Sequence, residues 1–383
     1  MSAERKTTDR AGWASEVGVP RTRAELDQRR DPILLAAIAQ VAPGTELRGG
    51  IDDIIRSKEG ALIVIGDPDE LAFLYSGGMK LNLPFTQQLL YEVAKMDGAI
   101  IVSPDIGRLA YANVQLMPDP TIASLETGTR HRTAERVAKQ TEALVISISQ
   151  QRETVTVFLG KRRYQLEVVA DVLAKTNQAL ATLETYRQRL DHVLTRLTAL
   201  EFQNAVVLDD VLVVLQRAEL TTRMAEEIER ACVELGSEGR MIRMQLEELV
   251  GEVPREKAAV VYDYHAQGGI DATREGLQAV TELAYKELLE FELLAVLGYP
   301  ATANPLDHSV QPRGYRVLSQ IPRLPDSVIR HVVEQMANLE AIVRASQRDL
   351  EAVDGVGGVR ARDIREGLRR LQEHNLVDRY LQL

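Results

Sequence analysis

A stretch of 75 residues, Lys161 to Leu235, contains neither glycine nor proline. Within it, leucine and valine recur every seven residues in two series, which Thr176 and Arg187 interrupt. The two series are Leu166, Leu173, Leu180 and Leu194, and Val169, Leu183, Leu190 and Leu197. This spacing is typical of a long amphipathic helix with a coiled-coil-like register, and we interpret the apolar stripe as packing surface rather than a cofactor site.

Further helices are expected downstream, so residues 163–310 are predicted to form an all-α helical spine. These helices cover about residues 205–235, 241–249 and 274–297. A break marked by Pro300, Pro305 and Pro312 then leads into a compact tail, residues 311–383. The tail helices are expected at 326–336, 339–345, 347–353 and 361–373. This spacing fits two consecutive short helical hairpins.

The first third of the chain alternates apolar runs with helical stretches, which predicts an α/β domain with a mixed sheet over residues 24–162. The expected elements are strands at 61–66 and 99–102, a helix at 85–95, and paired strands at 142–148 and 154–159. Residues 1–23 are polar and lack an apolar core, so we expect a flexible N-terminal extension rather than a secretory signal.

Composition narrows the class of protein. No run reaches about 18 uninterrupted apolar residues, so a membrane span is not expected. The single cysteine, Cys232, permits no internal disulfide and fits a reducing cytoplasm, and we expect it to be a buried helical residue.

Charge is distributed unevenly. The net charge of −10 argues against a general nucleic-acid binder. Residues 311–383, however, carry 12 arginines, no lysine and 10 acidic residues. Because the arginine guanidinium makes forked contacts to phosphate, this tail is the region expected to bind nucleic acid.

Two short segments about thirty residues apart carry the chemistry. In the first, Asp97 and Gly98 form a turn immediately before an expected strand. An Asp-Gly pair alone is most often only a turn. Its carboxylate is nevertheless a suitable hard ligand for Mg²⁺ or Mn²⁺, which bind one or two carboxylates plus substrate phosphates.

The second segment, Gly128 to Thr133, begins an expected helix with three basic side chains and two hydroxyls. Thr129 or Thr133 is expected to cap the helix, where free N–H groups favour an anion. The alternative is an ordinary solvated helix start. His131 is flanked by two arginines, which lowers its protonation unless an anion is present. The chain has neither a P-loop nor a dinucleotide-binding fingerprint.

Together, Asp97-Gly98-Ala99 and Arg130-His131-Arg132 resemble the signature of the diadenylate cyclase family. Residues 24–383 as a whole resemble family members with a helical spine and a DNA-binding tail. The resemblance implies that two ATP molecules condense to cyclic di-AMP and two pyrophosphates. Each domain would hold one ATP, and two domains would face each other to complete the site.

The resemblance also implies residue roles. Asp97, Arg130 and His131 would be catalytic, with Asp97 holding the Mg²⁺ or Mn²⁺ ion and His131 favoured as a phosphate ligand over a general base. The implied substrate contacts are the backbone of Gly98 and Ala99, Leu116 at the adenine, and Thr129, Arg130, His131, Arg132, Thr133 and Ser149 at phosphate and ribose. Relatives often have glutamate where this chain has Gln150, so no second carboxylate is expected there.

A glycine-rich turn joins two expected helices in the tail. It resembles a helix-hairpin-helix motif, whose exposed backbone N–H groups grip a DNA phosphate without reading bases. The expected DNA contacts are Gly355, Val356, Gly357, Gly358, Val359, Arg360 and Arg362. The alternative is a close-packed turn between helices. Residues 321–325, at the equivalent place in the first hairpin, lack both glycines and are expected to be structural.

The favoured hypothesis is a diadenylate cyclase coupled to sensing of branched or damaged DNA, such as four-way junctions in DNA repair. The resemblance implies an octamer whose cyclase output falls when DNA binds. The alternative is a non-catalytic nucleotide-sensing scaffold that binds DNA structures. Asp97 favours the enzyme, because a pure sensor would have less need of a metal ligand. A different nucleotidyltransferase is disfavoured, since such enzymes usually cluster two or three metal-binding carboxylates.

Overall fold

The computed structural model describes residues 31–289, 293–300, 304 and 306–381. The expected extension, residues 1–23, lies outside the described residues. The chain divides into two compact units. The sheet unit comprises residues 31–180 and Glu227–Gln245, and the helical unit comprises Ala181–Glu226 and residues 246–381. Two long helices, α7 (Val169–Gln203) and α8 (Leu208–Leu235), each contribute to both units.

The sheet unit contains one eight-stranded sheet in the order β2-β5-β4-β1-β6-β7-β8, with β3 also paired to β5. The strands are β1 (Leu62–Ile65), β2 (Tyr75–Ser76), β3 (Met79–Pro84), β4 (Ala99–Val102), β5 (Arg108–Leu116), β6 (Leu144–Ser149), β7 (Thr154–Leu159) and β8 (Arg162–Gln165). In the described sheet, β1 and β4 pair in parallel and the other pairs are antiparallel. The predicted mixed sheet is confirmed.

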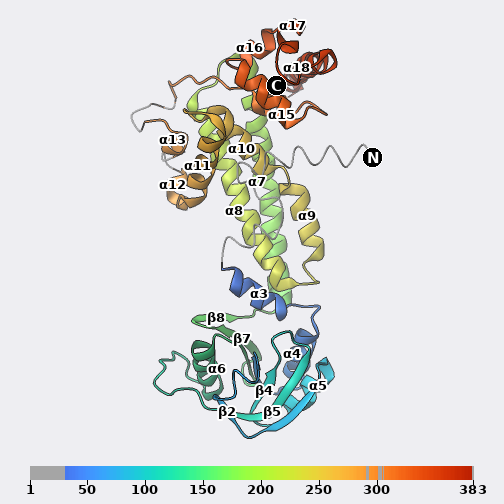
Figure 1. Ribbon diagram of the computed structural model, residues 1–383, viewed down its shortest axis with the longest axis vertical. Helices are drawn as coiled ribbons and strands as arrows, with labels where there is room; N and C mark the ends of the chain where they lie inside the picture. Colours follow the sequence, from blue (N-terminus) through green and yellow to red (C-terminus); the bar gives the residue numbers. More distant parts are fainter. Residues whose placement is uncertain (1–30, 290–292, 301–303, 305, 382–383) are drawn as a thin grey trace. The chain divides into compact units, whose positions relative to one another are not determined.

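Helices cover both faces of this sheet (Figure 1). One face packs against α4 (Glu46–Arg56) and α5 (Gln87–Ala94), through core residues such as Ile51 and Leu90. The other face packs against α6 (Thr129–Thr141). Because alternate residues of a strand point to opposite faces, β1 and β4 are buried along their whole length. A further helix, α3 (Pro32–Gln40), precedes α4.

The sheet extends further along the chain than the sequence indicated. Residues expected to open the spine instead form β8, which pairs antiparallel with β7. Leu166, assigned to the helical stripe, lies before α7 begins. Its N–H bonds the Val155 carbonyl at 2.9 Å, and its side chain packs in the core of the sheet unit. The prediction that Leu166 is helical is therefore wrong, because an apolar residue after an edge strand is buried in either setting.

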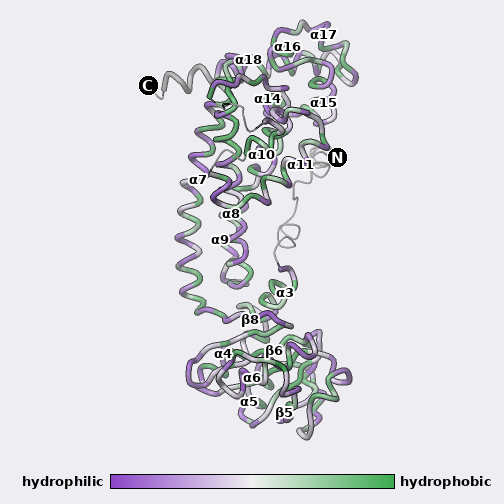
Figure 2. The backbone as a smooth tube through the Cα atoms, turned by 90° about the vertical axis from the view of Figure 1, so that its left-hand side faces the viewer, coloured by the Kyte–Doolittle hydropathy of each residue, from purple (hydrophilic) through white to green (hydrophobic). Residues whose placement is uncertain are grey.

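From Leu180 onward, the leucines of the predicted stripe are buried along α7. Leu183, Leu190 and Leu197 are almost fully buried, and Figure 2 shows polar and apolar stretches alternating along this helix. Arg187, which interrupts the stripe, pairs with Glu256 through its guanidinium at 3.0 Å. Cys232 is buried in α8, as predicted. In the part of the chain that is described, no helix is both long and apolar enough to cross a membrane.

The remaining helices in the described residues are shorter. They are α9 (Arg240–Val250), α10 (Val253–Tyr264), α11 (Gly269–Glu282), α12 (Tyr285–Leu289), α13 (Leu293–Val296), α14 (Tyr315–Ser319), α15 (Asp326–Gln335), α16 (Leu339–Arg344), α17 (Gln347–Glu351) and α18 (Gly358–Leu381). The single helix expected over 274–297 is wrong, since α11 ends at Glu282. The Arg223 guanidinium there bonds the carbonyls of Val280 and Leu283, at 3.1 and 2.7 Å, and so satisfies the helix end.

Helix α10 was not expected from the sequence. Val260 and Val261 pack into the core formed with α7 and α8, while Ala258 and Tyr262 pack into the core of the tail. A helix buried on both sides has no polar face, so the usual amphipathic period is absent. This helix therefore connects the spine to the tail through two apolar cores.

Candidate functional site

The sheet register places the two sequence motifs at one edge. β1 and β4 are parallel neighbours with Ile63 opposite Ile100. The residues that precede them, Gly60 and the Asp97-Gly98 turn, therefore lie side by side at the same edge of the sheet. We call this the site edge.

Two more predicted residues reach the site edge. β5 runs antiparallel to β4 with Val114 opposite Ala99, so Leu116 extends past the start of β4. β6 runs antiparallel to β1, and the Ile148 N–H bonds the Ala61 carbonyl at 2.9 Å. Ser149, the last residue of β6, consequently ends there as well.

The N-terminus of α6 lies at this same edge. The helix ends three residues before β6 begins at the opposite edge, so its first turn lies back toward Ser149. A direct bond supports this placement, because Arg130 Nη1 donates to the Ile148 carbonyl at 3.3 Å. The start of β4 and the end of β6 are two strand positions apart, about 10 Å at ordinary strand spacing. One nucleotide spans that separation.

The Asp97-Gly98 turn has the geometry expected of a close backbone approach. Gly98 has φ +94°, and a Cβ there would lie 2.9 Å from backbone atoms of Asn113 and Val114. Glycine is therefore required. Asp97 is exposed, and among the described residues its carboxylate takes part in no hydrogen bond or ion pair. Ala99 is buried, so it offers a ligand its backbone rather than its methyl group.

The α6 N-terminus is open to an anion. Its N-cap is Gly128 and no side chain bonds the first turn. The prediction that Thr129 or Thr133 caps the helix is therefore wrong, because the helix starts one residue earlier than a Thr129 cap would require. The first intrahelical bond runs from the Arg132 N–H to the Gly128 carbonyl at 2.9 Å. The N–H groups before Arg132 have no helical acceptor.

The two arginines of the motif point to different partners. Arg130 lies against Gly60, where a Cβ would come 2.1 Å from Arg130 Nη1. Arg132 instead donates to the loop carbonyls of Glu126 and Thr127, at 3.4 and 3.1 Å. Arg130 is therefore placed at the site edge, whereas Arg132 holds the loop before α6.

His131 lies half-buried on α6, with its ring edge-on to Phe158 at a centroid distance of 6.3 Å. Burial is the largest cause that lowers its pKa, and the charges of Arg163, Arg130 and Arg152 lower it further against the opposing charge of Glu126. The imidazole is therefore neutral near pH 7. It is suited to hydrogen bonding with a phosphate or ribose rather than to supplying a fixed charge.

Sequence reasoning missed three residues of this edge. Gly60 provides the space that Arg130 occupies. Arg152 lies in the β6–β7 turn, and its N–H bonds Ser149 Oγ at 3.3 Å. Arg163 on β8 pairs with Glu126 at 2.5 Å. The positive potential at His131 thus comes from β8 and the β6–β7 turn as well as from α6. Gln150, in the same turn as Arg152, is exposed.

Side chains of α6 hold the loop that leads into it. The loop partners, with their distances, are Asp119 N to Gln140 Oε1 (2.9 Å), Arg136 Nε to the Ile122 carbonyl (2.9 Å), Lys139 Nζ to the Ala123 carbonyl (2.8 Å) and Leu125 N to Glu135 Oε2 (3.1 Å). These bonds fix the entry to α6 and keep its open first turn in place.

The donor set fits a metal held jointly with substrate. No group of three or more His, Cys, Asp or Glu side chains able to hold a metal occurs in the described parts of the chain. Asp97 offers one carboxylate that has no partner among the described residues. Mg²⁺ commonly binds through one or two carboxylates, water and substrate phosphates, and Asp97 fits this mode of binding. The metal would therefore be held by Asp97 and the substrate together.

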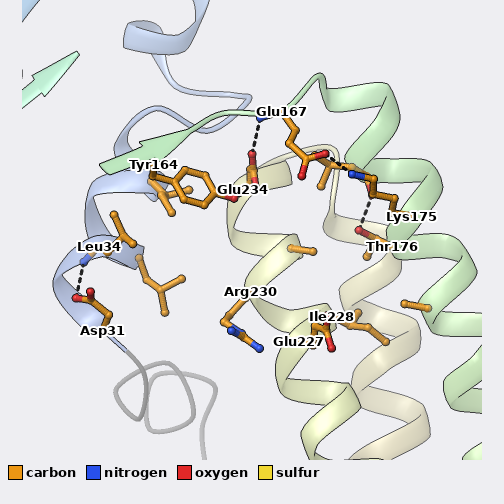
Figure 3. Close-up of a pocket in the computed structure, with 15 residues that line it drawn as sticks. Asp31, Leu34, Tyr164, Glu167, Lys175, Thr176, Glu227, Ile228, Arg230 and Glu234 are labelled. Atoms are coloured by element: carbon orange, nitrogen blue, oxygen red, sulfur yellow. Dashed lines mark hydrogen bonds and ion pairs between the residues drawn. The ribbon is translucent and has the colours of Figure 1, made fainter. Parts of the chain in front are cut away.

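A separate cavity of about 440 Å³ lies in the sheet unit, between α3, β8 and parts of α7 and α8 (Figure 3). None of the predicted site residues lines it. Its polar groups bond one another. Glu234 accepts the Tyr164 hydroxyl at 2.5 Å and the Glu167 N–H at 3.1 Å, and Glu167 pairs with Lys175. The cavity is therefore separate from the predicted nucleotide site.

Substitution of Gly60 tests the position of Arg130. In Gly60→Ala the new methyl would displace the end of a flexible side chain and leave the backbone unstrained. We expect ATP to bind about tenfold more weakly, with the melting temperature within about 2 °C of wild type. Calorimetry with ATP and a thermal melt measure these effects.

Gly49→Ala is the matched control. Its Cβ would likewise meet only the end of a flexible side chain, that of Gln87 at 2.4 Å, but on the helices of the opposite face. This variant should bind ATP normally. Equal ATP affinity in Gly60→Ala and wild type would contradict the assignment of Arg130 to the site edge.

The glycine turn of the tail, within Val353 to Arg360, has its own geometry. Val353 and Val356 are buried in the tail core, whereas Gly357 and Gly358 are exposed and Val359 is 73% exposed. Ala361 N–H bonds the Gly357 carbonyl at 3.0 Å, so the preceding N–H groups at the start of α18 lack helical acceptors.

The predicted DNA contacts differ in how far their side chains are exposed. Gly355 has φ +78°, and the Arg360 guanidinium bonds its carbonyl at 2.6 Å. Arg360 and Arg362 are both exposed, whereas the Val356 side chain is buried. Asp326, at the end of the first hairpin, is buried and pairs with Arg255 at 3.2 Å. This ion pair joins the start of α15 to α10.

An α/β domain whose sheet edge combines an open helix N-terminus, Arg130 and the exposed carboxylate of Asp97 defines a nucleotide-binding domain. Comparison with known proteins agrees. Residues 48–163 match the family described as the DisA bacterial checkpoint controller nucleotide-binding domain, and residues 166–306 match the DisA bacterial checkpoint controller linker region.

Individual relatives extend the similarity over most of the chain. DNA integrity scanning protein DisA from Carboxydothermus hydrogenoformans is 50% identical over 346 residues, which cover 90% of this chain and 98% of the relative. The protein of that name from Acetivibrio thermocellus is 45% identical over 92% of this chain and 98% of its own length, and the one from Bacillus pumilus is 46% identical over the same shares. The chain belongs to the DisA family of diadenylate cyclases.

Proposed function

We propose that this protein condenses two ATP molecules into cyclic di-AMP with release of two pyrophosphates. The observation that carries the proposal is the sheet edge itself, which assembles an open helix N-terminus, Arg130 and an unpartnered Asp97. A divalent ion bound there supplies charge neutralisation for the phosphates. Each domain would bind one ATP, and a second copy facing it would complete the reacting pair.

The residues of the site edge suit this reaction. The 3′-oxygen of one ATP forms a bond to the α-phosphorus of the other, and the bond from that phosphorus to the pyrophosphate oxygen breaks. The hydroxyl proton leaves to solvent, and a second such step closes the ring. Phosphoryl and nucleotidyl transfers depend mainly on positioning and charge stabilisation. Arg130, the α6 N–H groups and neutral His131 provide these without a dedicated base.

A product assay separates this proposal from a scaffold that binds nucleotide without converting it. The protein is incubated with ATP and Mg²⁺ or Mn²⁺, and the products are separated by chromatography with mass detection. We expect cyclic di-AMP to accumulate. Recovery of ATP unchanged, with ATP binding shown by calorimetry, would support the scaffold instead.

The tail is proposed to bind branched DNA through the glycine turn and to lower cyclase output when it does. The support is the exposed turn, its free N–H groups, and a lysine-free arginine content of 12 in residues 311–383. The relatives' name, which refers to scanning of DNA integrity, points the same way. An octamer built from face-to-face dimers would present several tails, and such avidity strengthens a weak single contact. Mass photometry tests the octamer.

Gly357→Val tests the turn. Nothing lies within 4 Å of a Cβ at this position, so the substitution fits the fold but fills the space a phosphate would need. We expect four-way-junction binding to weaken by about tenfold or more with an unchanged melt. Wild-type binding should fall as salt rises, because phosphate contacts release counterions. If the turn serves branched DNA, binding to the junction should also exceed binding to linear duplex.

Ala352→Val is the control, since it adds the same branched side chain at an exposed position just before the turn. Gel shifts with both DNA forms provide the readout. If Gly357→Val shifted the junction as well as wild type does, the glycine turn would not be the DNA contact.

A further inference from the structure

The tail is attached to α10 through a buried carboxylate. Asp263, one residue before the end of α10, is fully buried. Its Oδ1 accepts the N–H groups of Gly314 and Tyr315 at 3.0 and 2.8 Å, and its Oδ2 accepts that of Arg316 at 2.8 Å. These three residues begin α14, the first helix of the tail. One carboxylate of the spine therefore fixes the start of the tail.

A reciprocal contact runs the other way. Arg313 precedes α14, and its guanidinium donates to the carbonyls of Tyr262, Asp263 and His265 at 3.1, 2.8 and 2.8 Å. These carbonyls belong to the C-terminal end of α10, where a positive charge is favourable. Gly268 leaves room for this side chain, since a Cβ there would lie 2.5 Å from Arg313 Nη2.

A third set of contacts involves α7. Arg316 is buried, and its guanidinium bonds both carboxylate oxygens of Glu201, at 3.1 Å for the Nε contact, and Thr198 Oγ1 at 2.7 Å. The Tyr264 hydroxyl donates to Glu201 Oε1 at 2.8 Å. Glu201 and Thr198 lie near the end of α7, so α7, α10 and α14 share one buried polar cluster.

The cluster depends on all its members. Burial, and then the charge of Glu201, raise the pKa of Asp263 to about 7, while the N–H bonds from Tyr315 and Arg316 limit the rise. The three N–H bonds from α14 therefore offset part of the cost of burying this carboxylate. The apolar core around it includes Val353 and Val356, the two anchors of the glycine turn. The orientation of the turn therefore depends on this cluster.

We infer that Glu201, Asp263, Arg313 and Arg316 form a rigid joint of positioning residues that passes the effect of DNA bound at the tail into α7 and α10. This inference rests on the proposed function, because it assumes that the tail binds DNA and lowers cyclase output. α7 starts at Val169, four residues after β8 of the sheet ends. A tail held firmly at Glu201 acts on a helix that is continuous with the sheet unit, whereas a loosened tail binds DNA without acting on that helix.

Asp263→Asn in the full-length protein tests the joint. The amide keeps the shape but places an NH₂ group opposite the backbone N–H donors. Three quantities are measured for each protein: the cyclase rate without DNA, the Kd for a four-way junction, and the fall in rate at saturating junction. We expect the first two to stay within about threefold of wild type and the fall to shrink by about fivefold or more.

Asp271→Asn is the matched control, because it removes an exposed ion pair with Arg274 in the same unit. This variant should respond to DNA as wild type does. If Asp263→Asn proves unstable, Tyr264→Phe and Thr198→Val each remove one hydrogen bond from the joint and keep its carboxylates. They should show a smaller loss of the DNA response at an unchanged DNA-free rate.

The outcomes distinguish two failures. A wild-type protein that binds and responds to the junction, together with joint variants that respond equally, would overturn the joint. A wild-type protein that neither binds the junction nor changes its rate would overturn the proposed DNA function itself.

Discussion

Asp97→Asn should reduce cyclic di-AMP formation by about a hundredfold or more, because an amide is a poor ligand for a hard cation and carries no charge. The fold should survive. Asp97 is exposed, and among the described residues its carboxylate takes part in no hydrogen bond or ion pair. The substitution keeps the size of the side chain, and the neighbouring Gly98 retains its turn. Product formation by chromatography and a thermal melt measure the two effects.

Asp171→Asn, at an exposed position on α7, is the control for loss of one surface carboxylate. It should be fully active. Normal turnover by Asp97→Asn with a normal melt would remove Asp97 from the reaction and leave the site edge without a metal ligand.

Arg130→Ala should weaken ATP binding by about thirtyfold or more and stop turnover, since charge-assisted bonds to phosphate are among the stronger polar contacts. Its guanidinium is held at the site edge by the Ile148 carbonyl, at 3.3 Å. Arg130→Ala therefore removes a hydrogen-bond donor that is in position before ATP binds. Arg130→Lys keeps the positive charge but loses the forked guanidinium, so it should retain only part of the wild-type ATP affinity. Calorimetry with ATP gives the Kd of each variant.

His131→Ala belongs to the same experiment. Because the imidazole is neutral near pH 7, its loss should lower affinity less than the loss of Arg130 does. Arg56→Ala, an exposed arginine on α4 at the opposite face of the sheet, should bind ATP normally. Unaltered ATP affinity in both Arg130→Ala and His131→Ala would show that phosphate binds elsewhere.

The sequence indicated the core of the sheet because buried strands carry their signal locally. The runs that became β1, β4, β6 and β7 are short and β-branched, and their bounds agree with the prediction to within two residues. β5 was not foreseen. Its register shifts against both β3 and β4, which breaks the alternation that marks a half-buried strand.

Tertiary contacts explain the errors in the helical part. Glu282 ends α11 because Arg223, almost sixty residues earlier, bonds the carbonyls of Val280 and Leu283. No local pattern records such a contact. Helix α10 was not predicted for a different reason. Both of its faces are buried, so its sequence shows no amphipathic period.

The same distinction applies to the site. Asp97 and Arg130 lie in contiguous motifs and were found there. Gly60, Arg152 and Arg163 join them only through the register of β1, β6 and β8, so they needed the structure. Gly60 carried the one usable signal, a glycine directly before a buried strand.

The central claim is that a 3′-hydroxyl of one nucleotide attacks the α-phosphate of another at this sheet edge. Pyrophosphate release from ATP and from 3′-deoxy-ATP, measured side by side with Mg²⁺ or Mn²⁺, tests it most directly. The account predicts that each ATP consumed releases one pyrophosphate, and that 3′-deoxy-ATP binds with similar affinity but releases none. Release of pyrophosphate from 3′-deoxy-ATP at the rate seen with ATP would contradict the account, because another nucleophile would then attack the α-phosphate.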